Sequence, residues 1–379
     1  MNESIYEYFE RRDRKAEAQK IVNQTQVDLL EETPAGFDAI FKAQFYPDPD
    51  MALIKVEGHR PTVATIVSDD AEIPVSRERM TLTEDMIKDM RLVKSYAWTG
   101  KELKMFQKMQ QSDISAELKL IYEQHFFGTI RSLPVAIQDK SKMLAVPVGL
   151  KGALTFSDPI SGIPYEIDYT GYTVAEHMPA ALAGNARWNQ PTTCTPLQNL
   201  RDHSDAIFQT SSRPLRKRPK YILMNYAVFL LMRECNEVKL EWLTMKGIGI
   251  SDTPVLTGVK VPDDDLKAMI SKLVNPDTGC EVVIMNSEIS EEQTNKTIVD
   301  KPLFQADGST NWYMFGWDGM IERAFFPSTE AFLSGSSAGI FILNGQRVDK
   351  HPFRYWVEAS ANYMPLVPDP RMLAARKVV

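Results

Sequence analysis

The stretch that decides the fold runs from Gly128 to Tyr172 and reads GTIRSLPVAIQDKSKMLAVPVGLKGALTFSDPISGIPYEIDYTGY. Between residues 133 and 150 its apolar residues recur three and four positions apart, which places them on one side of a helix. Pro147 has no N–H to donate, so it is expected to kink or end this helix late. Gly149 and Gly152 then supply a stop signal. We therefore predict a long helix in the first half of the stretch.

A β-hairpin is predicted directly after this helix. Residues 153–156 form one short strand, and Asp158-Pro159 with Ser161-Gly162 supply the turn. Residues 165–169 alternate apolar and acidic side chains, as in a strand with one face in water. A long helix that leads into a polar-tipped hairpin is typical of a scaffold that holds other elements and carries no chemistry.

The bulk properties indicate a globular protein with more than one lobe. The 379 residues exceed what one compact core usually holds, and 44% of them are hydrophobic. The formal net charge of -7 argues against a protein that coats nucleic acid non-specifically. The N-terminus lacks the apolar core of a signal peptide, and the longest apolar run, Ala227 to Met232, is too short to cross a bilayer. We expect a soluble protein that is made in the cytosol.

The three cysteines point to the same compartment. Cys194, Cys235 and Cys280 are far apart in the sequence and form no CxxC pair. Disulfides are rare in cytosolic proteins because the compartment is reducing. We predict three free, mostly buried thiols.

The first hundred residues are expected to need a partner surface. Residues 2–30 have a helical but very polar pattern, which buries too little to form a stable lobe. Residues 52–56 and 62–67 have the pattern of strands in a long excursion that has no core of its own. Such segments are expected to project from the body of the protein.

Helical spacing returns at residues 101–125, where Ser112-Asp113 can break the segment in two and cap its second half. Residues 174–196 are rich in Ala, Pro, Asn and Thr, and we interpret them as a loop that joins lobes. From Leu197 onward, predicted helices and strands mix, which indicates an α+β fold.

Helices are predicted at 197–208 and after helix caps at Asn225 and Asp263. The remaining predicted features of this part are strands at 221–224, 255–261, 281–285, 353–360 and 372–378, and a hairpin turn at 306–308 between 303–305 and 312–315.

The sharpest catalytic candidate is Gly335-Ser336-Ser337-Ala338-Gly339, which matches the G-x-S-x-G pattern of hydrolases. In a hydrolase, Ser337 would lie on a tight turn between a strand and a helix, but the apolar run after it is too short for that helix. His351 is the only histidine after Ser337, and the aspartate between them, Asp349, is two residues from it. A catalytic triad needs its three groups to come from separate elements. We interpret the motif as a loop of small residues.

The other polar candidates also have structural interpretations. None of the five histidines stands in a metal-ligand spacing; they are His59, His125, His177, His203 and His351. Helix capping accounts for Asp263-Asp264-Asp265 without a bound cation. We interpret the other acidic clusters as parts of solvated turns; they comprise Asp48, Asp50, Asp69, Asp70 and Glu72. The sequence has no G-x-x-x-x-G-K-[ST] loop and no G-x-G-x-x-G motif, so nothing supports a nucleotide site.

The one notable basic patch is the loop from Arg213 to Lys220. It can contact phosphates, and it can equally pair with acidic neighbours. We favour a solvated or interface loop, because the patch lacks interleaved aromatic residues that would stack on bases.

The order of segments resembles the lambda-type major capsid protein E family of tailed bacteriophages. The similar stretches are Arg323 to Leu333 (RAFFPSTEAFL), Tyr363 to Leu373 (YMPLVPDPRML) and Leu150 to Tyr169. The resemblance implies a Hong Kong 97-like capsid fold of class α+β. Its parts would be an N-terminal arm (1–46), an extended loop that laps a neighbour (47–100), a peripheral domain with the long helix and hairpin (101–196), an axial domain (197–334) and a C-terminal return to the peripheral domain (335–379).

The resemblance also implies a function without catalysis. Subunits would form hexamers and pentamers of an icosahedral shell that encloses double-stranded DNA without sequence-specific binding, with no catalytic, cofactor-binding or metal-binding residue. The implied partners are further copies of the chain and scaffolding, portal and decoration proteins, with no membrane. The protein would be assembled in the host bacterial cytoplasm and reside in the virion. An acidic wall suits this role, because packaged DNA must not adhere to it.

Two alternatives remain at this point. One is a serine hydrolase that uses Ser337, and the other is a structural protein of a phage tail or baseplate. A fluorophosphonate probe tests the first, and the shape of the particles, tubes or rings against closed shells, tests the second.

Overall fold

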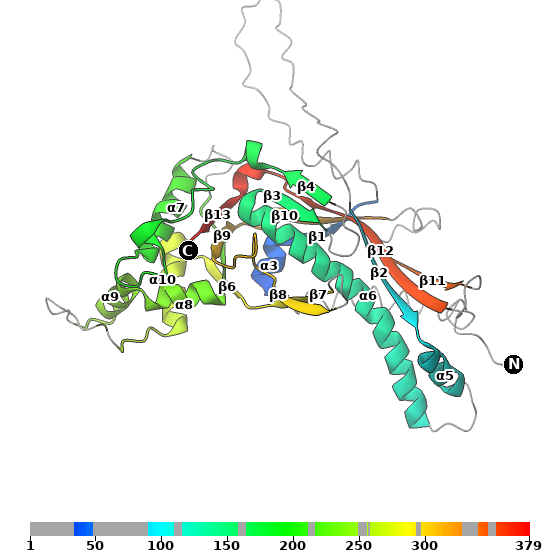
Figure 1. The fold of residues 1–379 in the computed structure, drawn as a ribbon. Helices are drawn as coiled ribbons and strands as arrows, with labels where there is room; N and C mark the ends of the chain where they lie inside the picture. The colour runs from blue at the N-terminus through cyan, green and yellow to red at the C-terminus, as the bar shows by residue number, and fades with distance from the viewer. Residues whose placement is uncertain are drawn as a thin grey trace, which may run out of the picture.

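Figure 1 shows the chain in a computed structural model, which has a mixed α+β fold. The structure describes residues 34–47, 90–109, 116–157, 164–210, 217–248, 256, 258–292, 297–327, 340–347 and 354–379. The predictions for residues 2–30, 52–56 and 62–67, and the candidates Ser337, Asp349 and His351, lie outside these ranges.

One long helix, α6 (Ala116–Lys151), runs through the middle of the molecule (Figure 1). Its 36 residues give it a length of about 54 Å, against about 30 Å for a small domain. The helix begins well before residue 133 and continues through Pro134 and Pro147, so of the two expectations for Pro147, a kink or an end, the end is wrong. It ends after Lys151, where Gly152 takes a φ of +71° and donates its N–H to the Val148 carbonyl at 2.8 Å.

Helix α6 packs against a five-stranded sheet. Strands β1 (Phe41–Phe45), β10 (Ile321–Phe326), β12 (Arg354–Leu366) and β11 (Phe341–Arg347) follow one another, and β2 (Met90–Trp98) also pairs with β12. The short helix α3 (Ala35–Ile40) precedes β1, and Phe37, Ile40 and Phe41 are fully buried. Residues from both ends of the chain therefore build one core.

The C-terminal part of α6 also contacts a second sheet of four strands. Its order is β13 (Ala374–Lys377), β9 (Trp312–Gly316), β5 (Tyr221–Asn225) and β6 (Glu281–Met285), and only the β5–β6 pair is parallel. Helices α7 (Pro196–Thr210), α8 (Tyr226–Glu234), α9 (Asn236–Met245) and α10 (Asp263–Val274) gather on this lobe (Figure 1). The single helix α6 thus connects two separate sheets.

Two small hairpins complete the described part. Strands β3 (Ala153–Ser157) and β4 (Pro164–Asp168) form the hairpin predicted after the long helix. Strands β7 (Glu288–Glu292) and β8 (Ile298–Pro302) form a second hairpin below α6 (Figure 1). Helix α5 (Gly100–Met109) contacts α6, and the break predicted at Ser112-Asp113 lies outside the described residues.

The predictions for the second lobe are confirmed in most places. In the predicted loop 174–196, residues 174–195 are irregular apart from one short 3-10 turn, and Pro196 begins α7. The Asn225 side chain caps α8 by accepting the Ala227 N–H at 2.9 Å. Strands also form at the predicted positions around 221–224, 281–285, 353–360 and 372–378.

Three local predictions are wrong. Asp263 does not cap α10, because Pro262 occupies the cap position and Asp263 lies in the first turn. Val259 and Val261 are not in a strand, since Gly258 has a φ of +85° and Pro262 follows closely. The turn at Asp307-Gly308 exists, but residues 303–305 form no strand before it and only the Ala306–Ser309 bridge closes it.

Candidate functional site

The described histidines are structural, and two of them lie close together. His203 is buried; its Nδ1 accepts the Tyr313 hydroxyl at 2.8 Å, and its Nε2 donates to the His177 carbonyl at 3.0 Å. Burial lowers the pKa of His203 to about 4, so its imidazole is neutral at pH 7. His177 donates from Nδ1 to the Arg371 carbonyl at 2.6 Å, and burial lowers its pKa as well. Both rings hold the 174–196 segment to the rest of the lobe.

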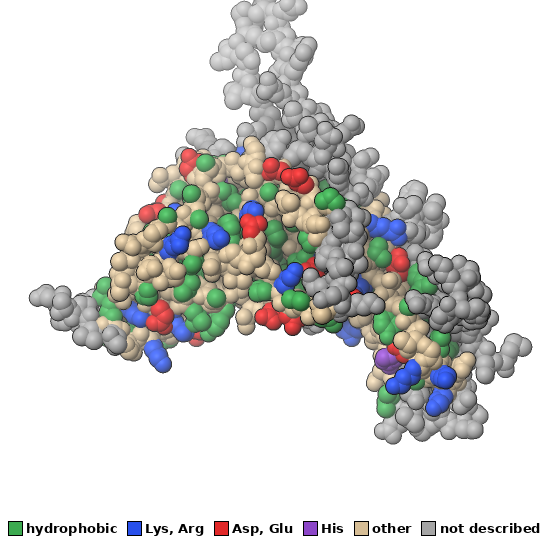
Figure 2. Space-filling view, viewed as in Figure 1, with side chains coloured by type: hydrophobic (Ala, Val, Ile, Leu, Met, Phe, Trp, Pro, Cys, Tyr) green, Lys and Arg blue, Asp and Glu red, His purple; other side chains and the backbone are tan. Residues whose placement is uncertain are grey.

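The basic loop from Arg213 to Lys220 is described only from Lys217 onward. There, Arg218 contacts Asp205 at 2.8 Å and Lys220 contacts Asp318 at 2.7 Å. Acidic neighbours in the same chain therefore balance these two cations. Figure 2 shows acidic and basic side chains interspersed over the viewed face.

The aspartates at the start of α10 bind neighbouring side chains. Asp263 accepts from Arg233 at 2.8 Å, and Asp265 accepts from the Trp242 indole at 2.8 Å. Acidic residues in the first turn also interact favourably with the helix dipole. Within the described ranges, no group of three or more His, Cys, Asp or Glu residues is placed to hold a metal ion.

The most concentrated buried polar cluster lies around Arg323 in β10. Its guanidinium donates to the Phe41 carbonyl at 2.9 Å, to Gln138 at 3.0 Å and to Ser141 at 3.3 Å. Asp38 lies 3.4 Å away and supplies the opposite charge. Burial lowers the pKa of Arg323, but a guanidinium stays charged at neutral pH. One side chain therefore joins β1, β10 and the middle of α6.

Two tyrosines extend this cluster to the C-terminal strands. Tyr363 in β12 donates to the Ser141 carbonyl at 2.8 Å, and burial raises its pKa. Tyr169, which follows β4, donates to the Pro365 carbonyl at 3.1 Å. The centre of α6 is thus tied to strands from both ends of the chain.

A second cluster joins β2 and α5 to the N-terminal part of α6. Glu102 accepts from the Tyr96 hydroxyl at 2.5 Å and from both the N–H and the hydroxyl of Thr99 at 2.7 Å, and His125 of α6 lies 3.3 Å away. Burial raises the pKa of Glu102, but these hydrogen bonds outweigh it and lower the pKa to about 2. The Thr99–Glu102 pair is a capping box at the start of α5. Strand β2, α5 and α6 meet at this carboxylate.

A third cluster holds the β7–β8 hairpin against α6. Glu291 accepts from Lys140 of α6 at 2.6 Å and from Lys301 of β8 at 2.5 Å. Burial opposes ionisation of Glu291, but the two lysines outweigh it and lower its pKa. Glu292 adds a longer contact of 3.5 Å with Lys94 in β2.

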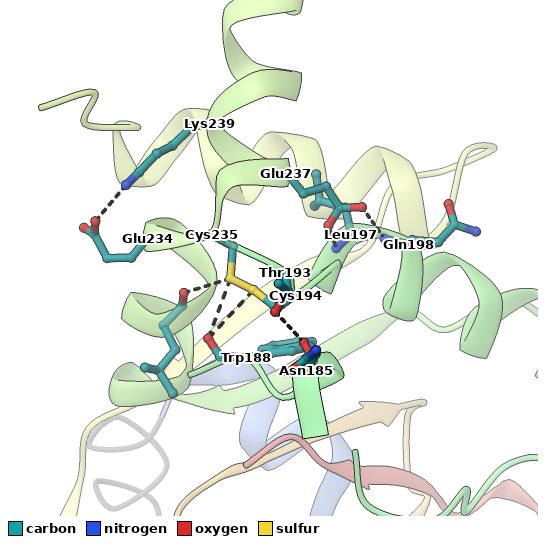
Figure 3. The surroundings of a disulfide bond; sticks show 11 residues. Asn185, Trp188, Thr193, Cys194, Leu197, Gln198, Glu234, Cys235, Glu237 and Lys239 are labelled. Carbon is teal, nitrogen blue, oxygen red and sulfur yellow. Dashed lines mark hydrogen bonds and ion pairs between the residues drawn. A yellow bond between two sulfur atoms is a disulfide. The ribbon is translucent and has the colours of Figure 1, made fainter. Parts of the chain in front are cut away.

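A disulfide bond joins Cys194 to Cys235, so the prediction of three free thiols is wrong for this pair (Figure 3). The two residues are 41 positions apart in sequence, but folding places their Cα atoms 6.4 Å apart. Cys235 lies at the junction of α8 and α9, and Cys194 lies just before α7. Cys280 is buried and free, as predicted, and burial raises its pKa to about 12.

These clusters differ in how clearly the sequence signals them. The Thr-x-x-Glu spacing at Thr99 is a recognisable helix-start signal, which the sequence-based predictions missed. Glu322 and Arg323 are adjacent charged residues in the buried strand Ile321–Phe326, and a charge in a buried strand indicates a partner without naming it. No signal links Cys194 to Cys235. Chemically, all of these clusters join segments of the chain to one another, and none is arranged around a reacting group.

No helix in the described ranges combines the length and the apolar character needed to cross a membrane.

The two ends of the segment 46–89 are anchored on one row of the five-stranded sheet. In this row Phe45 pairs with Phe325, Phe325 with Tyr363, and Tyr363 with Met90.

Comparison with known proteins finds similarity among solved structures. No protein-family model and no curated protein sequence matches the chain. A crystal structure of a candidate capsid protein from a prophage of E. coli CFT073 is 14% identical with a TM-score of 0.49, covering 77% of this chain and 78% of the other. A phage-related protein from Bordetella bronchiseptica RB50 is 10% identical with a TM-score of 0.46 and 94% coverage of both chains. A chain of the satellite phage P4 procapsid is 8% identical with a TM-score of 0.40, covering 95% of this chain and 98% of that one.

Proposed function

We propose that this chain is the major capsid protein of a tailed bacteriophage, with a Hong Kong 97-like fold of the lambda type. The observation that carries the proposal is the anchoring of residues 46–89. At one end, the Tyr46 N–H donates to the Phe325 carbonyl of β10 at 2.9 Å. At the other end, Met90 of β2 pairs with Tyr363 of β12, which itself pairs with Phe325. A long insertion that leaves from and returns to one row of a rigid sheet has a fixed base from which it can reach a neighbouring subunit.

The rest of the described architecture supports the same proposal. Helix α6 links the five-stranded sheet to the four-stranded sheet, so that two lobes share one stiff element. The buried clusters at Arg323, Glu102 and Glu291 fasten strands to this helix. A shell subunit needs this kind of rigidity, because a closed lattice repeats each subunit's geometry many times.

In this proposal the segments have the following roles. Residues 1–46 are the N-terminal arm, with residues 35–46 built into the core, and 47–100 are the extended loop. Residues 101–196 form the peripheral domain, 197–334 the axial domain, and 335–379 the return to the peripheral domain. Strand β13 also pairs with β9, so the return reaches the four-stranded sheet as well.

Copies of the chain would form hexamers and pentamers of an icosahedral shell around double-stranded DNA, with a structural and not an enzymatic role. Scaffolding, portal and decoration proteins would be its partners, and assembly would take place in the host cytoplasm. The net charge of -7 supports a wall to which DNA does not adhere. The pairing of Arg218 and Lys220 with acidic residues agrees with this.

The proposal is tested by deleting the insertion. Residues 47–89 are replaced by a six-residue Gly-Ser linker, which spans up to about 20 Å. The three strand spacings between β1 and β2 amount to about 14 Å, so the sheet can still form. Electron microscopy of the unaltered chain should show closed shells or capsomers, and the deletion variant should remain a folded monomer by circular dichroism and sizing.

A matched control replaces residues 293–296, the tip between β7 and β8, by Gly and Ser residues, and should assemble normally. Tubes or open rings from the unaltered chain would point instead to a tail or baseplate protein. Normal shells from the deletion variant would refute the role given to residues 47–89.

A further inference from the structure

We propose that Cys194 and Cys235 form a redox-dependent latch, which is an open dithiol under reducing conditions and closes into a disulfide in an oxidising medium. Closing the latch fastens the 185–197 segment to the junction of α8 and α9. The latch belongs to the folded single chain and does not depend on the proposed shell function.

The environment of the two sulfurs accommodates both states. In the closed state the bond lies in the interior, with Cys194 2% exposed and Cys235 fully buried. In the open state the Cys235 thiol has a carbonyl acceptor ready, because the Leu231 oxygen lies 3.3 Å from its sulfur. The Trp188 carbonyl lies 3.7 Å from the Cys235 sulfur and 3.9 Å from the Cys194 sulfur. Figure 3 shows it facing both sulfurs. Each thiol of the open state therefore has a carbonyl within reach.

Non-covalent contacts keep the two thiols adjacent when the bond is open. The Asn236 N–H donates to the Pro191 carbonyl at 2.8 Å. The Glu237 carboxylate accepts the N–H groups of Leu197 and Gln198 at 2.8 and 3.1 Å, and so caps α7 from the neighbouring helix. These bonds flank both cysteines, so the fold pre-organises the pair for oxidation.

The loop side of the latch gives access to an oxidant. The residues from Asn189 to Thr195 are exposed, apart from Cys194 itself. Cys235 lies between two helices and is fully buried. Local opening of the loop therefore exposes Cys194 at lower free energy than any opening that exposes Cys235.

The chemistry is thiol–disulfide exchange with a small disulfide such as oxidised glutathione. The Cys194 thiolate attacks one sulfur of the small disulfide, forms a mixed disulfide and releases one small thiolate. The Cys235 thiolate then attacks the Cys194 sulfur, forms the protein disulfide and releases the second small thiolate. Two protein thiols lose two electrons and two protons, and one small disulfide becomes two small thiols.

The test uses the full chain, reduced with dithiothreitol, desalted and incubated with oxidised glutathione under native conditions. After unfolding and alkylation, mass spectrometry should find one alkylated cysteine, Cys280, and a Cys194–Cys235 crosslinked peptide. The reduced sample should have three alkylated cysteines. Hydrogen exchange of residues 185–197 should be slower in the oxidised sample by roughly thirtyfold or more.

Two variants separate the latch from other effects of oxidation. Cys235→Ser should abolish the difference in exchange between the oxidised and reduced samples, whereas Cys280→Ser should leave it unchanged. Three alkylated cysteines after native oxidation, or a crosslink that involves Cys280, would overturn the proposal. A Cys194–Cys235 bond that forms without slowing exchange in residues 185–197 would overturn it as well.

Discussion

Replacing Arg323 by alanine should destabilise the centre of the molecule by about 4 kcal/mol. The side chain is 1% exposed and makes three hydrogen bonds of 3.3 Å or less, to Phe41, Gln138 and Ser141. Each such bond contributes on the order of 1–1.5 kcal/mol net. The acceptors that remain have no route to water, and the nearby Asp38 loses its counter-charge.

The matched control is Arg233→Ala, which removes one ion pair with Asp263 at 2.8 Å. Both of its side chains are partly exposed, so the loss should be about 0–1 kcal/mol. Urea unfolding gives the free energy of each variant, and peptide-resolved hydrogen exchange gives its location. Faster exchange in Arg323→Ala should concentrate in β1, β10 and the middle of α6. A loss no larger than that of the control, or faster exchange confined to the four-stranded sheet, would refute the reasoning.

Three further changes test other parts of the fold. Glu102→Gln should lower the thermal midpoint at pH 7 by weakening the cap of α5. Because the pKa of the folded carboxylate is about 2, its contribution to the stability of the fold is complete above about pH 4.5 and is lost as the pH falls through 2. The melting temperatures of the variant and the unaltered chain should therefore converge in acid. Gly36→Ala should cost about 1–3 kcal/mol in urea unfolding, since the added Cβ would lie 2.4 Å from a Val283 methyl, whereas Gly128→Ala, with open space in α6, should stabilise by roughly 0.5–1 kcal/mol. Glu291→Gln should raise the rate of proteolysis in the β7–β8 hairpin without moving the main unfolding transition. A rate equal to that of the unaltered chain would show that the contacts with Lys140 and Lys301 do not hold the hairpin against α6.

Local patterns in the sequence predicted the elements well where one rule dominated. The helix and hairpin around Gly152, the cap at Asn225 and the strand at 281–285 each follow from spacing or from one residue's chemistry. The helix continues from Pro147 to Lys151, because tertiary contacts on the sheets outweigh the loss of one helical hydrogen bond. Val259 has the side chain of a strand residue, but the backbone around Gly258 and Pro262 prevents a ladder.

Long-range contacts could not be predicted in this way. The cysteine pair, the Arg323 cluster and the docking of β1 on β10 depend on segments that are far apart in the chain. A single sequence shows the polarity of each residue but not which distant residue it will contact. The role of the chain was suggested by a family resemblance and by no constellation of reactive side chains.

The docking of β1 on β10 also bears on how the protein is synthesised. Arg323 binds a carbonyl 282 residues earlier in the chain, and β12, which completes the row, is made later still. At roughly 5–20 residues per second, the apolar side chains of α3 and β1 wait about 15 to 60 s on the ribosome for their partners. A prematurely released chain would lack the row on which Met90 is anchored. In the proposed capsid role, only a chain synthesised past β12 could therefore present residues 47–89 to a neighbouring subunit.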